Sequence, residues 1–341
     1  VVTAPETVRG PGTLITREEI RQSGARSVAD LLEKREGIQI ERYGGSGQPA
    51  AIRIRGGSPA QVLFLLNDVP LNPSLGGGTD LNTLDLDNID SIEIIRGAVA
   101  AAAGQGAFSG VIHIRTRTPQ ETQKAAGSLS LSGGSFRTLG TGGRVLLPGN
   151  GRLRPVLELH GGYQESAGGY LFPGQPALSP SGEYTLGGSP VKHRNTGFTS
   201  GTAGLSLGWG SAADPLAFTL TLNCSGRDAG VPGTIDFPTV DASQKDQRIL
   251  VTAETDLRRP GMLRRDSLLI RLFFLQQQRW YRDFSLFDTE SSHRMSHPGL
   301  LIRYQGRAGR ILVRGDISLD HEVLDSTVFA ETLARDRKRG V

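Results

Sequence analysis

The sequence contains almost no cysteine and no long apolar run. Cys224 is the only cysteine among 341 residues, which excludes a disulfide within the chain. Its place in the alternating run Thr219–Ser225 favours a small strand residue over a nucleophile. No run of 18 apolar residues occurs, so no transmembrane helix is expected. A transmembrane β-strand needs only about 9–11 alternating residues, so this composition still fits a membrane-embedded barrel.

Sequence motifs for phosphate binding, catalysis and metal binding are missing as well. The chain has neither a Gly-Lys-Ser/Thr element nor a G-x-G-x-x-G element. Its six histidines are scattered, and no Ser/His/Asp, Cys/His or paired-carboxylate set has supporting context. The net charge of +4 is dispersed, without a recognisable nucleic-acid module. We therefore expect no enzyme, no nucleic-acid partner, no cofactor and no metal site. No signal peptide is visible. The chain opens with VVTA and without a methionine, which predicts a processed or trimmed start.

The first third of the chain combines two helical patterns with short strands. Thr16 with Glu19 forms a capping-box pattern that predicts a helix over 17–22, and Ser27 with Asp30 predicts a second helix over 28–35. A turn is expected at Asn67-Asp68, and a short helical turn over 81–89. Strands are expected at 38–40, 52–55, 61–66, 92–95 and 111–114.

A run of small residues from Ala98 to Phe108 separates the last two of these strands. Such density of small residues fits a tight connection between strands or a glycine-rich loop that holds a phosphate. The second reading is weak because no Gly-Lys-Ser/Thr and no amphipathic helix follows.

Helical patterning ends at Thr118, and the remaining sequence is typical of successive strands. A short connection at 147–151 and a long one at 167–196 show the alternation found in up-and-down barrels of outer membranes. A soluble β-sandwich has the same apolar alternation, so the residues alone leave both folds open. Strands are expected at 128–132, 144–147, 155–163, 198–209, 216–223, 249–257, 268–275, 299–304 and 311–319.

Four segments, in this order, resemble the plug domain of TonB-dependent outer-membrane receptors. They are ITREEIRQSGARSVADLLEKREGIQI at 15–40, IRIRG at 52–56, VLFLLNDVPLN at 62–72 and IEIIRGAVAAAAGQGAFSGVIHIR at 92–115. Within that family, the Tyr43–Pro49 segment followed by IRIRG is most similar to receptors for cobalamin. Two positions depart from the family pattern: Asn67-Asp68 replaces Asp-Gly, and alanines at 98, 100 and 103 replace Pro, Ser and Tyr.

The resemblance implies a mainly β protein with a small α+β plug followed by an antiparallel transmembrane β-barrel. The implied parts are an arm at 1–10 that resembles a TonB box, a plug at 11–120, and the N-terminal part of the barrel at 125–341. A plugged transporter barrel has about 22 strands, whereas the residues after 125 suffice for about ten. The chain also ends without a terminal aromatic residue, so a truncated barrel is expected.

By the same resemblance, the protein is expected in the bacterial outer membrane, as a monomer surrounded by lipid. It would take up a scarce, bulky nutrient, first of all cobalamin or a related corrinoid, with ferric siderophore or haem as alternatives. The energy would come from a TonB-like periplasmic partner, to which an extended arm can add as a strand. A signalling receptor and a non-transporting remnant are the other readings.

The resemblance also suggests which residues act. TonB coupling is expected at Val1, Val2, Thr3 and Ala4, for which a flexible terminus is the alternative. Substrate contacts are expected at the apical loops, for which ordinary exposed turns are the alternative: Gln48, Pro49, Ala50, Asn72, Ser74 and Leu75. Ion pairs between plug and barrel are expected at Arg53, Arg55, Arg96 and Arg115. Residues 227–234, with Asp236 and Asp241, are expected in a long outer loop whose carboxylates are solvated or bind Ca²⁺.

Overall fold

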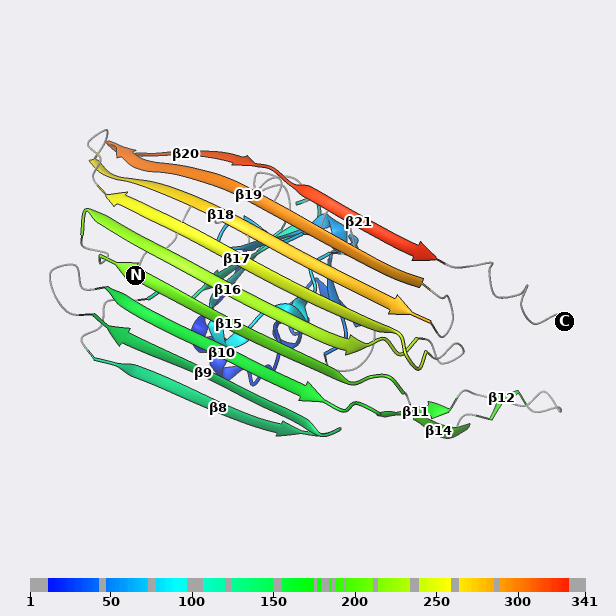
Figure 1. Ribbon diagram of the computed structural model, residues 1–341. Coiled ribbons are helices and arrows are strands. Elements are labelled where there is room, and N and C mark those ends of the chain that lie inside the picture. The colour runs from blue at the N-terminus through cyan, green and yellow to red at the C-terminus, as the bar shows by residue number, and fades with distance from the viewer. Residues whose placement is uncertain are drawn as a thin grey trace.

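The computed structural model has two parts, a small N-terminal α+β domain and a large antiparallel sheet that curves past it (Figure 1). The helices and the short strands of the N-terminal domain lie against one face of the sheet. The structure describes residues 12–42, 47–72, 78–96, 107–119, 124–149, 155–174, 177–178, 184–185, 188–192, 194–210, 214–233, 239–258, 264–284 and 289–330.

Both predicted helices are present and begin at the predicted caps. Helix α1 spans Arg17–Gln22, and the Thr16 backbone N–H donates to Glu19 Oε2 at 2.8 Å in a complete capping box. Helix α2 spans Val28–Glu33, and the Asp30 backbone N–H donates to Ser27 Oγ at 3.2 Å. Helix α2 ends before the expected Arg35, because Lys34 already leaves the helical conformation.

The N-terminal domain is built on a five-stranded sheet in the order β1-β6-β7-β4-β5, with a separate β2–β3 hairpin. Strands β4 and β7 pair in parallel, which brings residues near 64 and 112 together. The core between sheet and helices contains Ile15, Leu31, Ile52, Phe64 and Ile92, all fully buried. The strands are β1 Thr13–Ile15, β2 Ile38–Arg42, β3 Ala50–Ile54, β4 Val62–Leu66, β5 Val69–Pro70, β6 Ile89–Arg96 and β7 Gly110–Thr116, and the 3₁₀ turns are η1 Pro59–Gln61, η2 Leu81–Thr83 and η3 Leu86–Asn88.

The predicted turn at Asn67-Asp68 joins β4 to β5 without a glycine. Asn67 has φ 50° and Asp68 has φ 63°, as a tight two-residue hairpin turn with positive φ at both positions requires. Asn and Asp tolerate this conformation better than other side chains do. Asn67 also holds the neighbouring strand, since its Oδ1 accepts from the Thr116 backbone N–H at 2.9 Å and its Nδ2 donates to Thr116 Oγ1 at 2.8 Å.

The large sheet is antiparallel and runs in the order β20-β19-β18-β17-β16-β15-β10-β9-β8. Strand β21 pairs with residues 289–296 of β19 and β20 with residues 299–308, so both lie along the same edge of β19. The long connection between β10 and β15 carries small hairpins that project beyond the sheet (Figure 1). The strands are β8 Ala126–Gly134, β9 Thr138–Pro148, β10 Val156–Ser166, β11 Leu171–Gly174, β12 Ala177–Leu178, β13 Tyr184–Thr185, β14 Gly188–Lys192, β15 Phe198–Trp209, β16 Leu216–Gly230, β17 Ser243–Arg258, β18 Arg264–Asp283, β19 Thr289–Ala308, β20 Ile311–Asp320 and β21 Val323–Ala330.

The two faces of the large sheet decide between sandwich and barrel. On β17, Asp246, Arg248 and Glu254 share the face that meets the N-terminal domain, whereas on β8 Leu129 and Leu131 are 76% and 78% exposed on the opposite face. A sandwich would bury its apolar face against a second sheet. A polar inner face with an apolar outer face is the pattern of a transmembrane barrel wall. No helix in the described part of the chain has the length and apolar character needed to cross a bilayer.

The expected loop at residues 227–234 is wrong in its first part. Strand β16 continues to Gly230, and Arg227 pairs in register with Asp246 of β17. The Arg227 side chain is 3% exposed and faces the N-terminal domain. Charged residues interrupt the apolar alternation here because they line the inner face of the sheet. Asp236 lies outside the described residues, and Asp241 is exposed.

Candidate functional site

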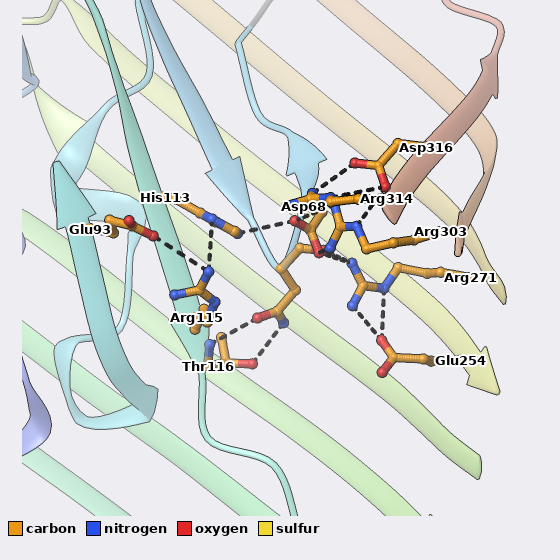
Figure 2. A network of polar contacts seen from close by, with 11 residues as sticks. Asp68, Glu93, His113, Arg115, Thr116, Glu254, Arg271, Arg303, Arg314 and Asp316 are labelled. Carbon is orange, nitrogen blue, oxygen red and sulfur yellow. Dashed lines mark hydrogen bonds and ion pairs between the residues drawn. The ribbon is translucent and has the colours of Figure 1, made fainter. Parts of the chain in front are cut away.

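A first cluster of charged side chains joins the N-terminal domain to the large sheet at Asp68 (Figure 2). Asp68 Oδ2 lies 2.7 Å from Arg271 Nη1 on β18, and Asp68 Oδ1 lies 3.4 Å from Arg303 Nη2 on β19. Arg271 Nη1 also donates to the backbone carbonyl of Asn67. Because Asp68 sits in the turn between β4 and β5, the hairpin turn itself presents the carboxylate to the sheet.

The arginines of this cluster are held by further carboxylates on the sheet. Arg271 donates to Glu254 of β17, and Arg303 Nε donates to Asp316 Oδ1 of β20 at 3.0 Å. Arg314 Nη2 donates to Asp316 Oδ2 at 2.7 Å. Four neighbouring strands therefore position two guanidinium groups toward one half-buried carboxylate.

His113 completes the cluster from within the N-terminal domain. Its Nδ1 lies 3.4 Å from Arg115 Nη2, and since arginine can only donate, this contact fits the tautomer with the proton on Nε2. That Nε2 lies 3.4 Å from Asp68 Oδ1, without hydrogen-bond geometry. Burial lowers the pKa of His113 to about 4 despite the nearby Asp68 carboxylate, so the ring is neutral at pH 7.

The pKa of Asp68 moves in the opposite sense to what burial alone would cause. Burial raises the pKa of a carboxyl group. Attraction to the His113 ring, which is charged only in acid, and to Arg271 and Arg303 outweighs burial and holds the pKa of Asp68 well below its ordinary range. Asp68 is therefore ionised throughout the neutral pH range. Its ion pairs with the two arginines persist over that range.

A second cluster joins the two parts at Asp80. Arg227 Nη1 on β16 lies 2.6 Å from Asp80 Oδ2, without hydrogen-bond geometry, and Arg227 Nη2 donates to Asp246 Oδ2 on β17 at 2.5 Å. Arg279 Nε on β18 donates to Asp246 Oδ1 at 2.7 Å. Asp80 Oδ1 accepts from the Ala50 backbone N–H at 3.1 Å, which ties the cluster to the start of β3. Burial raises the pKa of Asp80, and Arg227 works against that rise.

A pocket opens beside this second cluster, between the N-terminal domain and strands β16 to β19 and β21. Most of the residues that line it are polar, and it lies a few residues inside the end of the strands that carries the long connections. Among the described residues, no group of three or more His, Cys, Asp or Glu side chains is placed to hold a metal ion. The polar side chains that line the pocket include Thr79, Asp80, Asp246, Arg248, Gln277 and Arg279.

Comparison with known proteins identifies the N-terminal domain. Residues 4–111 match the family model described as the TonB-dependent Receptor Plug Domain. The N-terminal domain is a TonB-dependent receptor plug domain. The vitamin B12 transporter BtuB of Vibrio cholerae serotype O1 (strain ATCC 39541 / Classical Ogawa 395 / O395) is 33% identical over 144 residues, which cover 42% of this chain and 24% of that protein. BtuB of Vibrio vulnificus (strain CMCP6) is 31% identical over 156 residues, 46% of this chain and 25% of that protein.

Solved structures extend the likeness from the plug to the barrel. The copper transporter OprC has a TM-score of 0.70 at 13% identity and covers 93% of this chain and 47% of its own. The ferric citrate transporter FecA, unliganded, has a TM-score of 0.66 at 17% identity and covers 94% and 48%. The chain thus spans about half the length of these structures and about a quarter of the curated relatives. Plug and polar-lined sheet together have the TonB-dependent receptor fold, which places the chain in the bacterial outer membrane.

The predicted ligand-contact residues have mixed surroundings. Gln48 is 1% exposed, with no hydrogen-bond partner for its side-chain amide among the described residues, and Ala50 is buried beside Asp80. Pro49 is half-buried. Asn72 braces the plug sheet, since its Oδ1 accepts from Phe64 N–H and its Nδ2 donates to Val62 C=O, both at 2.7 Å. Ser74 and Leu75, like the arm at Val1, Val2, Thr3 and Ala4, lie outside the described residues.

Three of the four predicted plug–barrel arginines have side chains that contact groups of the plug itself, which corrects their expected role. Arg53 Nε donates to Glu41 at 2.5 Å across the β2–β3 hairpin, and Arg115 lies 3.5 Å from Glu93 across β6 and β7. Arg96 donates to Thr13 Oγ1 at 2.9 Å and to the Glu36 carbonyl at 3.1 Å. Arg55 follows the end of β3 with φ 51°, and its backbone N–H donates to the Gly37 carbonyl.

The polarity of the interface is therefore the reverse of the expected one. In both charge clusters the plug supplies the carboxylate, Asp68 or Asp80, and the barrel supplies the arginine. Cross-strand carboxylates inside the plug, Glu41 and Glu93, engage Arg53 and Arg115 because they lie within reach on neighbouring strands. A sequence signal did exist for the barrel side. Arginines at inward-facing positions of otherwise apolar strands, such as Arg271 in LLIRLFF, mark a polar inner wall.

Proposed function

We propose that this receptor takes up a bulky, scarce nutrient across the outer membrane, and that the nutrient is cobalamin or a related corrinoid. The likeness to vitamin B12 transporters carries this proposal, because these curated relatives are 31% to 36% identical to the chain over 104 to 156 residues. The solved transporters share the fold at 13% to 17% identity, which favours none of their ligands.

The interface between plug and barrel supports a coupled mechanism. One end of the ligand would bind in the pocket beside Asp80, which has room for only a small part of a bulky nutrient. The pocket lies near the strand ends with the long connections, which face outward in barrels of this kind. Passage then requires the plug to shift away from the wall, and the pairs of Asp68 and Asp80 with barrel arginines must break. The energy would come from a TonB-like periplasmic partner that binds residues 1–4 as an added strand.

A ferric siderophore or haem complex is the second candidate ligand. Receptors for these cargoes stand among the solved structures that share the fold, including the siderophore receptor PirA from Acinetobacter baumannii, with a TM-score of 0.63. The stretch similar to vitamin B12 transporters covers 42% of this chain, so more than half of the chain has no such support. Ligand selectivity depends on the barrel wall.

A binding titration tests the proposal. The receptor, expressed from its own gene and purified in detergent, is titrated with cyanocobalamin, a ferric siderophore and haemin. We expect saturable binding of cyanocobalamin and weaker binding of the others. Saturable binding of the siderophore or haemin alone would replace the corrinoid with that ligand. Failure of the protein to enter outer membranes would instead favour a non-transporting remnant.

A further inference from the structure

One arginine in the pocket between plug and barrel has no carboxylate partner among the described residues. Arg248 of β17 lines the pocket, and its Nη2 donates to Thr83 Oγ1 at 2.8 Å. Its Nε is buried and has no hydrogen-bond partner in the part of the chain that the structure describes. A guanidinium group has five N–H donors, and a buried cation without a countercharge is unfavourable. Arg248 therefore has unused capacity to bind an acceptor.

The surrounding charges do not neutralise it. Asp246 accepts hydrogen bonds from Arg227 and from Arg279, and Asp80 contacts Arg227. Three guanidinium groups thus share two carboxylates in this cluster, and both carboxylates are already engaged by the other two arginines. The cluster therefore carries one net positive charge, and Arg248 is the arginine without a carboxylate contact among the described residues.

Neutral polar groups stand beside this charge. Thr79, 3% exposed, has a buried hydroxyl without a hydrogen-bond partner among the described residues. Gln277 places its amide in the same pocket, where Nε2 donates to the Leu71 carbonyl at 3.0 Å. Hydroxyl and amide groups next to a guanidinium that lacks a carboxylate partner can complete the hydrogen bonds of an oxygen-bearing ligand.

We propose that Arg248 binds an oxyanion group of the ligand, a carboxylate or a phosphate ester, in this pocket. Such groups accept two parallel N–H bonds from one guanidinium, which is stronger than a bond between neutral partners. The inference rests on the proposed function, because it assigns a charge class to the transported ligand. It favours a ligand that carries a negative oxygen group at its bound end over one that is neutral there.

The test measures anion binding without any assumption about the nutrient. The detergent-solubilised receptor is melted in low millimolar citrate or inorganic phosphate, at constant ionic strength against chloride. An anion that binds only the folded state raises Tm. Both anions also stabilise proteins by exclusion from their surface, so the signal is the part of the shift that depends on Arg248. A response to citrate alone indicates a carboxylate site, and a response to phosphate alone a phosphate-ester site.

Three variants make the result specific. We expect Arg248→Gln to bind the anion at least tenfold more weakly, and Arg248→Lys to keep part of the affinity because it keeps charge without the planar fork. Arg307→Gln, at an exposed position near the other end of β19, should respond like the wild type. Equal Tm shifts in wild type and Arg248→Gln, or no shift in wild type, would overturn the proposal.

The outcome also separates this inference from the corrinoid proposal. Arg248-dependent anion binding without cyanocobalamin binding would support the oxyanion site and remove the corrinoid. Cyanocobalamin binding that is unchanged in Arg248→Gln, with no anion response, would overturn the oxyanion site alone.

Discussion

Replacing Asp68 with asparagine should loosen the plug from the barrel wall. Asparagine keeps the size of the side chain and tolerates the positive φ of the turn, so only the charge is lost. Removing one partner of a buried ion pair costs about 3–5 kcal/mol. The lower figure applies here, because Arg271 keeps Glu254 and Arg303 keeps Asp316. A loss of about 3 kcal/mol corresponds to a roughly 150-fold change in an opening equilibrium.

Hydrogen exchange of the detergent-solubilised protein measures this change locally. The peptide around the β4–β5 turn contains amides that close the hairpin, such as Leu71 N–H donating to Phe64 C=O at 2.9 Å. We expect their protection to fall by about two orders of magnitude in Asp68→Asn. The control is Asp90→Asn, the same change at an exposed position of β6. Equal protection in the two variants would refute the assigned role of Asp68.

A double-mutant cycle identifies the partner. Asp68→Asn and Arg271→Gln remove the two sides of a contact at 2.7 Å, so their effects on protection should not add. A coupling of at least about 1 kcal/mol is expected for groups in one network. Additive effects would mean that the two side chains stabilise the plug independently.

Three further predictions concern pH, packing and the turn. Because His113 titrates at about pH 4 when folded but near its ordinary value of 6.5 when unfolded, acid favours the unfolded state between these values. When the pH is lowered from 6.5 to 5, the free energy of unfolding of His113→Gln should fall by about 2 kcal/mol less than that of the wild type. Thermal melts at the two pH values measure this difference. Leu275→Ala, at a barrel position packed into the plug core, should cost about 3 kcal/mol, whereas Leu272→Ala on the 56% exposed outer face should change stability little in detergent. Asn67→Val should lower the stability of the turn by at least about 2 kcal/mol, because φ 50° strains a β-branched residue and both hydrogen bonds to Thr116 are lost. Similar hydrogen-exchange rates in Asn67→Val and wild type would contradict this.

Local sequence chemistry predicted the helices and the turn well. The capping box at Thr16 and the cap at Ser27 act within a few residues, so both helix starts are readable from the sequence alone. The Asn67-Asp68 turn is local in the same sense, since its requirement for positive φ depends only on the two residues in it. Apolar alternation likewise predicted β15 with its observed bounds, Phe198–Trp209.

Contacts between distant segments could not be predicted in this way. Arg227 and Asp80 are far apart in sequence, and only the register of β16 against β17 and the seating of the plug bring them to 2.6 Å. Residues 227–234 were therefore expected in an outer loop, although Arg227 lines an inner wall. Alternation alone also could not separate barrel from sandwich, because both alternate. The contact between the polar face of the sheet and the plug, which decides between the two folds, is visible only in the structure.

Energy-coupled uptake of labelled cyanocobalamin by whole cells tests the central claim most directly. Cells that display the receptor in the outer membrane are compared with cells that lack a TonB-like protein, and with cells that carry Val2→Pro in the arm. Proline cannot donate the backbone hydrogen bond that an added strand needs. The account predicts saturable uptake that disappears in both comparisons while cyanocobalamin binding at the cell surface persists. Uptake that continues without the TonB-like protein would contradict the account. So would a lack of uptake by cells that have the TonB-like protein and a correctly inserted receptor.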